Sequence, residues 1–230
     1  MSNSKLVSFA RISPNRTSPR THTIDTVTIH CTAGQLSVEQ LGDIFASVER
    51  GASSNYGIGT DGRVGMYVEE SDRSWCSSNA VNDDRAVTIE VASGKYHPYA
   101  VSDKAYTALI DLLTDICRRN GIKRLVWSES KNDRVNHLGG CNMTVHRDYA
   151  NKSCPGTYLY ERHGEIAAKV NAKLSPKTKS EEINDFVWEL AERGIVTDKA
   201  LWLEKAESDV NVYWLMKKFT EFLQRQSRNV

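Results

Sequence analysis

The sequence has almost no excess charge and no long apolar segment. Its 230 residues carry 30 Lys and Arg against 29 Asp and Glu, a formal net charge of +1. A protein held on nucleic acid mainly by phosphate contacts would show a basic excess, so no nucleic-acid partner is expected. No apolar run reaches the roughly 18 residues that a membrane-spanning helix needs, so no membrane insertion is expected either.

Cysteines are few, and a signal peptide is not apparent. The five cysteines are odd in number and irregularly spaced, which argues against a disulfide framework and favours free thiols or a metal ligand. The first nine residues are polar and contain no apolar segment of signal-peptide length. We therefore expect synthesis in the cytoplasm, and another factor must release the chain if it acts outside the membrane.

Strands and helices are mixed over the first three quarters of the chain. Asp25–His30 and Ala86–Val91 alternate polar and apolar residues, as half-buried strands do. Two further strands flank the turn at Asp61-Gly62, and Leu125–Trp127 is predicted as a short buried strand. Asp103 is predicted to cap a long helix that ends at Gly121, while residues 1–24 are expected to be an irregular arm. This mixture predicts an α/β or α+β layer architecture.

A change of composition after residue 174 predicts a domain boundary. Residues 175–180 contain Ser, Pro and Lys and are predicted to be a linker. Residues 181–230 then show three short amphipathic helices, which predict a small all-α domain. Trp202, Tyr213 and Trp214 could stack on sugars, although aromatic residues at helical spacing more often pack in a core.

A His and a Cys near residue 150 form the most informative part of the sequence. His146 and Cys154 lie in a loop that ends in Pro-Gly, so both side chains could turn toward one cation. His30, at the end of a predicted strand, is a third candidate, although a lone histidine at such a position is more often satisfied by local hydrogen bonds. Two His and one Cys would leave the fourth position of a tetrahedral zinc open, which is the catalytic pattern.

Glu90 is unusual because of its place on a strand. In the predicted strand 86–91 it shares a face with Thr88, opposite the apolar residues. If this face is in solvent, Glu90 is an ordinary surface carboxylate. If it faces the cleft that holds His30, Glu90 becomes a candidate general base.

Four motifs together resemble the type 2 N-acetylmuramoyl-L-alanine amidases, zinc enzymes that are related to peptidoglycan recognition proteins and common among phage endolysins. The resemblance covers about residues 20–173 and preserves the order of the family's motifs. The last motif is the most specific, with His, then Lys six residues on, Cys two further, and Pro-Gly. The motifs are Thr28–Gly34, Ser54–Gly59 with Asp61-Gly62, Val87–Glu90 and His146–Gly156.

The resemblance implies a site and a fold. It places zinc ligands at His30, His146 and Cys154. It implies a catalytic Glu90, a Lys152 near the developing oxyanion, and an active-site Tyr56. It also implies a mixed central β-sheet flanked by helices over residues 1–174, with zinc in a groove on the sheet. The bond implied as substrate joins N-acetylmuramic acid to L-alanine in bacterial peptidoglycan.

Several functions remain open at the level of sequence. A phage or prophage endolysin would act on the wall after release, whereas a cytosolic relative would recycle soluble muropeptides. A non-catalytic peptidoglycan-binding protein on the same fold is an alternative from another class, and a zinc peptidase that cuts within the stem peptide is a third. The helical domain is expected either to bind the cell wall or to form a homodimer.

Overall fold

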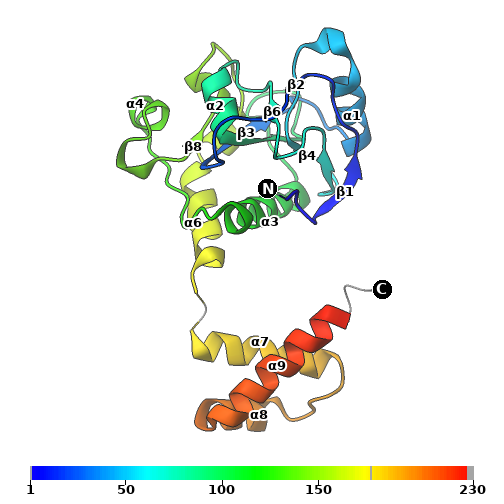
Figure 1. The fold of residues 1–230 in the computed structure, drawn as a ribbon, viewed down its shortest axis with the longest axis vertical. Coiled ribbons are helices and arrows are strands. Elements are labelled where there is room, and N and C mark those ends of the chain that lie inside the picture. The colour runs from blue at the N-terminus through cyan, green and yellow to red at the C-terminus, as the bar shows by residue number, and fades with distance from the viewer. Residues whose placement is uncertain (1, 177, 227–230) are drawn as a thin grey trace. The chain divides into compact units, whose positions relative to one another are not determined.

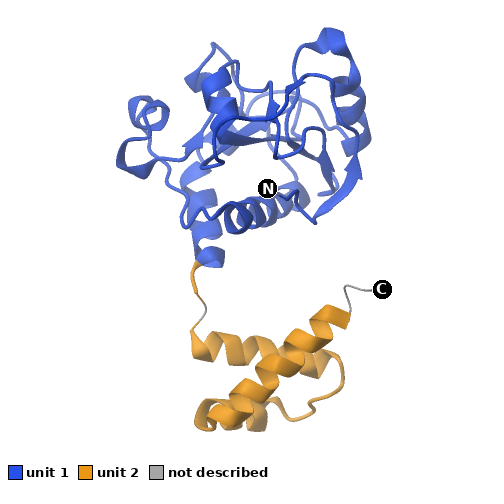
Figure 2. Cartoon of the chain, viewed as in Figure 1, with its two compact units in different colours: residues 1–174 blue, residues 175–230 orange. Residues whose placement is uncertain are grey.

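The computed structural model describes residues 2–176 and 178–226. The chain divides into two compact units, residues 1–174 and residues 175–230 (Figure 2), and each is described by itself. Lys177 of the predicted linker and residues 227–230 of the predicted helical domain lie outside the described residues.

Unit 1 is built on a mixed sheet, which lies at the centre of the unit (Figure 1). Its six strands have the order β1-β5-β4-β7-β3-β8. The hairpin pair β4 and β5 is antiparallel, as the turn at Asp61-Gly62 predicts, and the other neighbouring strands are parallel. A separate antiparallel pair joins β2 (Arg16–Thr17) and β6 (Arg73–Ser74). The strands of the main sheet are β1 (Val7–Ala10), β3 (Thr26–Cys31), β4 (Tyr56–Ile58), β5 (Val64–Met66), β7 (Ala86–Val91) and β8 (Met143–Thr144).

Helices cover the sheet, and the predicted mixed sheet flanked by helices is confirmed. The long α3 and α6 lie together against one face (Figure 1), where Leu109, Leu113 and Ile166 pack onto the strand residues Ile29 and Ile89. A smaller cluster fixes α1 against the edge formed by β1 and β5. The helices are α1 (Val38–Ala46), α2 (Ala80–Arg85), α3 (Asp103–Asn120), α4 (Lys131–Val135), α5 (Gly156–Tyr160) and α6 (His163–Leu174).

The polar face of the central strands is buried, not half-buried as the alternating pattern predicts. Thr28 and Thr88 are both fully buried. The Thr28 hydroxyl hydrogen-bonds the Thr144 hydroxyl at 2.7 Å and accepts from the Asn82 amide at 3.1 Å. Likewise, the Thr88 hydroxyl is 2.7 Å from that of Ser74. Polar side chains from β6, β8 and α2 therefore cover this face and satisfy its hydrogen bonds without exposing it to solvent.

Three local predictions differ from the structure. The arm at residues 1–24 contains β1, which pairs with β5 at the edge of the sheet. Ser102, not Asp103, caps α3, and its hydroxyl accepts from the Ala105 amide. Residues 125–127 form no strand, because side-chain amides replace the ladder partners there. The Leu125 amide, for example, donates to the Asn171 side chain at 2.7 Å.

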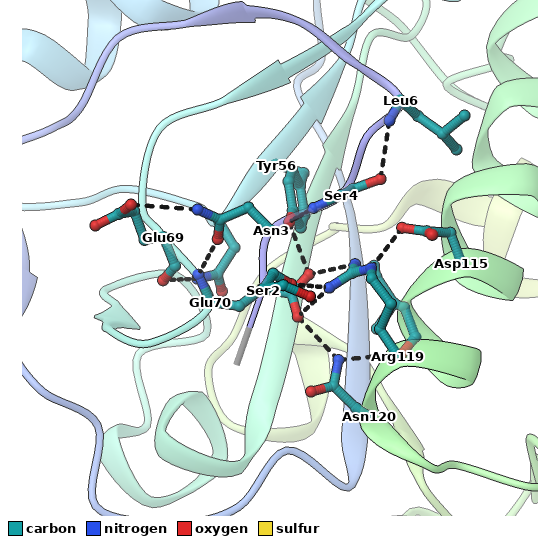
Figure 3. A network of polar contacts seen from close by, with 12 residues as sticks. Ser2, Asn3, Ser4, Leu6, Tyr56, Glu69, Glu70, Asp115, Arg119 and Asn120 are labelled. Atoms are coloured by element: carbon teal, nitrogen blue, oxygen red, sulfur yellow. Dashed lines mark hydrogen bonds and ion pairs between the residues drawn. The ribbon is translucent and has the colours of Figure 1, made fainter. Parts of the chain in front are cut away.

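A buried ion pair ties the start of the chain to the core of unit 1 (Figure 3). Arg119 of α3 donates to both carboxylate oxygens of Glu70, at 2.6 and 2.9 Å, and the Glu70 side chain is fully buried. The Tyr56 hydroxyl donates to the same carboxylate at 2.7 Å and accepts from the Ser4 amide at 2.9 Å. Asn120 adds another donor to Glu70. The carboxylate thus joins three segments that are distant in sequence.

Removing the arginine of this network should destabilise unit 1 strongly. Arg119→Met would leave the Glu70 carboxylate buried without its counter-charge, which typically costs about 3–5 kcal/mol. We expect the thermal midpoint of unit 1 to fall by about 10 °C. Arg63→Met, which removes an exposed ion pair with Glu39, serves as the control and should shift the midpoint little. Equal shifts in the two variants would contradict this assignment.

Unit 2 consists of α7 (Lys179–Glu192), α8 (Lys199–Ser208) and α9 (Val210–Gln226). Their apolar stripes meet in a small core that includes Ile183, Val187 and Met216. Of the three aromatics singled out by sequence, Tyr213 is buried and Trp202 packs on this core, whereas Trp214 remains 50% exposed. In the described part of the chain, no helix combines the length and the apolar character required to cross a membrane.

Candidate metal centre

His30 and Glu90 lie side by side at the carboxyl ends of two central parallel strands. His30 is the fifth residue of β3 and is fully buried. The parallel register of β3 and β7 pairs His30 directly with Glu90. Paired residues of neighbouring strands project from the same face of a sheet. The face that carries Glu90 is therefore the face that carries His30.

The other two predicted ligands reach His30 from the loop after β8. Pairing of Thr144 with Thr28 aligns β8 with β3, so His146 follows two residues later, beside His30. The two imidazole centroids are 5.1 Å apart. Cys154 Sγ is 3.3 Å from His30 Nδ1, and one ligand atom from each of the three residues lies within 4.8 Å of the others.

Hydrogen bonds hold this loop in place. The Arg147 guanidinium donates to the carbonyls of Ser153 and Cys154 and stacks on the Tyr160 ring, 4.4 Å from its centroid. The Cys31 amide donates to Cys154 Sγ at 3.4 Å. Both contacts fix the thiol on the side of His30, which reduces the conformational cost of binding a metal.

The protonation states suit a metal site. Burial, together with the neighbouring His146, lowers the pKa of His30 to about 3. Burial and the nearby Lys152 also lower the pKa of His146. Both imidazoles are therefore neutral at pH 7, the form that binds metal. The hydrogen bond with the Cys31 thiol and burial raise the pKa of the Cys154 thiol, so a bound cation would have to displace its proton.

The donor set passes a simple test of fit for zinc. Two neutral imidazoles and one thiolate are typical zinc ligands, and ligands on a tetrahedral zinc lie roughly 3.5 Å apart. The 3.3 Å between His30 Nδ1 and Cys154 Sγ is close to this spacing. Three protein ligands would leave one position open, as catalytic zinc sites require.

A cavity of about 220 Å³ opens over the cluster. Glu90, His146, Lys152 and Cys154 line its polar side, together with Arg50. Its apolar wall comes mainly from α1 and the preceding turn, through Leu36, Leu41, Ile44 and Phe45. Burial, and secondarily the Cys31 thiol, raises the pKa of Glu90 to about 8. The cavity thus brings the candidate metal ligands together with the carboxyl group of Glu90 and the amino group of Lys152.

Comparison with known proteins identifies the family. The family model of N-acetylmuramoyl-L-alanine amidases matches residues 20–157, which include all four motifs. The chain belongs to this family. The amidase is therefore an enzyme that acts on peptidoglycan, and the predicted family and enzyme class are confirmed. No curated protein sequence matches the amidase significantly.

Solved structures share the amidase fold. The catalytic domain of XlyA matches with a TM-score of 0.52 at 15% identity, covering 70% of this chain and 97% of that chain. An AmpD derivative matches with a TM-score of 0.51 at 18% identity, and the match covers 73% of this chain and 99% of that chain. A mutant endolysin from Bacillus subtilis matches with a TM-score of 0.50 at 13% identity, and the match covers 70% of this chain and 97% of that chain. At these identities the likeness shows the fold.

Tyr56 lies outside the site of the amidase. The register pairs Tyr56 with Ile89 and Gly57 with Glu90, so the Tyr56 side chain projects from the face opposite to Glu90. Its hydroxyl bonds to Glu70 in the buried network (Figure 3). The structure contradicts the active-site position predicted for Tyr56, because strand register, not motif proximity, decides the face.

Two residues at the site were missed by sequence reasoning. Arg50, at the end of a short 3-10 helix (Val48–Arg50), lines the cavity and opposes the rise in the pKa of Glu90. Cys76 has its thiol within 4.8 Å of ligand atoms of both His30 and Glu90. Neither residue belongs to a sequence motif that predicts a functional site, so only the fold brings Arg50 and Cys76 to the site.

Proposed function

We propose that the amidase uses zinc to hydrolyse the amide bond between N-acetylmuramic acid and L-alanine. Zinc would be held by His30, His146 and Cys154. The observation that carries this proposal is the convergence of these three ligands with Glu90 and Lys152 around one cavity. Membership of the amidase family supports peptidoglycan as the substrate.

The residues around the cavity suit amide hydrolysis. Zinc, when bound, supplies Lewis-acid polarisation of the scissile carbonyl and activation of water. Glu90 would take the proton of the attacking water and deliver it to the leaving amine. Its raised pKa favours this exchange of a proton near neutral pH. Lys152, an exposed residue that lines the cavity, would stabilise the negative charge that develops on the carbonyl oxygen.

The product of digestion tests this function directly. Purified peptidoglycan is incubated with the full chain, with and without a zinc chelator, and the products are identified by mass spectrometry. We expect free stem peptides that begin at L-alanine, and only without the chelator. Cleavage inside the stem peptide would identify a peptidase. Release that is unaffected by the chelator would overturn the role of zinc.

Loss of the lysine should slow catalysis without removing the metal. A group that stabilises an oxyanion typically contributes about 2.7–4 kcal/mol, so Lys152→Met should lower kcat by about 10²–10³-fold. Lys131→Met, in α4 outside the cavity, is the matched control. Zinc content measured on both variants should equal that of the wild type. An unchanged kcat in Lys152→Met would exclude this role.

We propose an endolysin of a phage or prophage as the biological setting. The name of one fold relative, an endolysin, motivates this assignment. An endolysin should release peptides from intact sacculi. A cytosolic recycling amidase would instead prefer soluble muropeptides, so rates on the two substrates separate these roles.

We propose further that unit 2 binds the cell wall. Trp188 is 54% exposed, and Lys199 Nζ lies 3.6 Å from the centroid of its ring. The Trp188 side chain lines a cavity of about 540 Å³ together with Asp185, Glu189, Glu192 and Arg193. An exposed indole among polar groups suits stacking on sugars.

Substitution of this indole tests the role of unit 2. Trp188→Ala in the full chain should lower the affinity for peptidoglycan about tenfold. The affinity is measured from the fraction of protein that sediments with peptidoglycan. Trp75→Ala, an exposed indole of unit 1, is the control. Unchanged sedimentation of Trp188→Ala together with a dimeric mass in solution would favour the alternative role of unit 2 in dimerisation.

A further inference from the structure

A second set of ligand atoms shares His30 with the proposed zinc site. The ligand atoms of His30, Cys76 and Glu90 all lie within 4.8 Å of one another. Cys76 has no role in the proposed hydrolysis. Its thiol is nevertheless next to the two residues on which that hydrolysis depends most.

The loop that carries Cys76 is held firmly against β7. The backbone amides of Cys76 and Ser77 both donate to the buried Asp83 carboxylate, at 2.9 and 3.1 Å. One end of the loop is fixed by the 2.7 Å hydrogen bond between the hydroxyls of Ser74 and Thr88. Thr88 lies two residues before Glu90 on the same face of β7. These contacts of the folded chain hold the Cys76 thiol beside Glu90.

Two buried atoms of this cluster lack a hydrogen-bond partner. In the described part of the chain, His30 Nε2 and Glu90 Oε2 are both inaccessible to solvent and unpaired. His30 as a whole is fully buried. A buried polar atom without a protein partner is unfavourable, so both atoms are available to a ligand. Here both atoms belong to the same three-residue cluster.

We propose that His30, Cys76 and Glu90 form a second, inhibitory site for a thiophilic divalent cation, such as Cd²⁺ or excess Zn²⁺. A thiolate, an imidazole and a carboxylate together favour such cations over Mg²⁺ and Ca²⁺, which prefer all-oxygen sites. The two anionic ligands would balance the charge of the cation. The Cys76 thiol is buried, so a cation would reach it from the cavity that Glu90 lines.

Inhibition follows from the two shared residues. A cation at the second site occupies the Glu90 carboxylate, which can then no longer exchange protons with water and substrate. It also competes for the His30 ring with the zinc site. This part of the inference rests on the proposed function, whereas binding of the cation does not.

Cadmium titration of metal-free protein tests binding without any activity assay. Cys154→Ser removes the thiolate of the proposed zinc site, so any remaining thiolate-to-Cd²⁺ charge-transfer absorbance must come from another cysteine. We expect this absorbance to persist in Cys154→Ser and to disappear in Cys154→Ser/Cys76→Ser. The matched control, Cys154→Ser/Cys31→Ser, should keep it. Identical titrations for Cys154→Ser with and without Cys76→Ser would overturn the proposal.

The carboxylate provides an independent check. In the Cys154→Ser background, Glu90→Gln should weaken Cd²⁺ binding at least about tenfold, since it removes an anionic ligand. Equal affinity would exclude Glu90 from the site.

Inhibition of the zinc-loaded enzyme is measured separately. Excess Cd²⁺ should inhibit peptide release by the wild type. Each protein's rate is expressed as a fraction of its own rate without Cd²⁺, and Cys76→Ser should then need at least about tenfold more Cd²⁺ for half inhibition. Equal inhibition of the two proteins, with Cd²⁺ still bound through Cys76, would overturn the inhibitory role alone. An inactive wild type that still binds Cd²⁺ through Cys76 would instead refute the proposed function and leave the metal site standing.

Discussion

Cys154→Ser should lose both the bound zinc and nearly all amidase activity. Cys154 is the only anionic ligand of the proposed set, and its Sγ lies 3.3 Å from His30 Nδ1. Lewis-acid catalysis contributes several kcal/mol, which corresponds to a loss of about 10³-fold or more in kcat. Zinc content by elemental analysis and release of stem peptides are measured on the same sample.

Two matched variants sharpen this test. Cys141→Ser changes a buried cysteine that lies outside the cluster, and should keep both zinc and activity. Cys154→Asp offers zinc a carboxylate in place of the thiolate and should retain more metal than Cys154→Ser. A Cys154→Ser protein with a full equivalent of zinc and the wild-type rate would rule out the proposed ligand set.

Glu90→Gln should lower kcat by about 10²–10⁴-fold while zinc remains bound, as expected for the loss of a general base. The substitution keeps the size of the side chain and its place beside His30 on the neighbouring strand. Because Glu90 is proposed to act on protons and not to bind substrate, KM should change much less than kcat. Steady-state kinetics on soluble muropeptides, with zinc measured in parallel, provide the readout.

The control for this variant is Glu49→Gln, which alters an exposed carboxylate in the 3-10 helix near the cavity. It should leave kcat unchanged. If Glu90→Gln instead loses its zinc, Glu90 is a ligand of the catalytic metal, not a base. If it keeps both zinc and rate, another group moves the proton.

Much of the site could be predicted because its residues lie in short motifs. The spacing of His146 and Cys154 within one loop, together with His30 at the end of a strand, predicted a metal site, and the family resemblance added Lys152. Alternation along residues 86–91 placed Glu90 on a polar face, but left open whether that face met solvent or a cleft. The direct pairing of His30 with Glu90 answers this question, and strand order is a long-range property that spacing within a motif does not contain.

The errors have related physical causes. Tyr56 lies in a family motif, yet register directs its side chain to the opposite face, where its hydroxyl donates to the Glu70 carboxylate that pairs with Arg119. The polar faces of β3 and β7 are buried because side chains of other elements, such as Thr144 of β8 and Ser74 of β6, supply hydrogen bonds that no periodicity predicts. Cys76 reaches the site through a loop with no motif of its own, although Asp83 fixes its backbone. Long-range packing decides all three cases.

A crystal structure of the protein purified with zinc, with anomalous data collected at the zinc absorption edge, tests the central claim most directly. The account predicts an anomalous peak bounded by His30, His146 and Cys154, next to the cavity lined by Glu90 and Lys152. With zinc at one equivalent, it predicts no comparable peak between Cys76 and Glu90. An active enzyme with no zinc among His30, His146 and Cys154 would contradict the account.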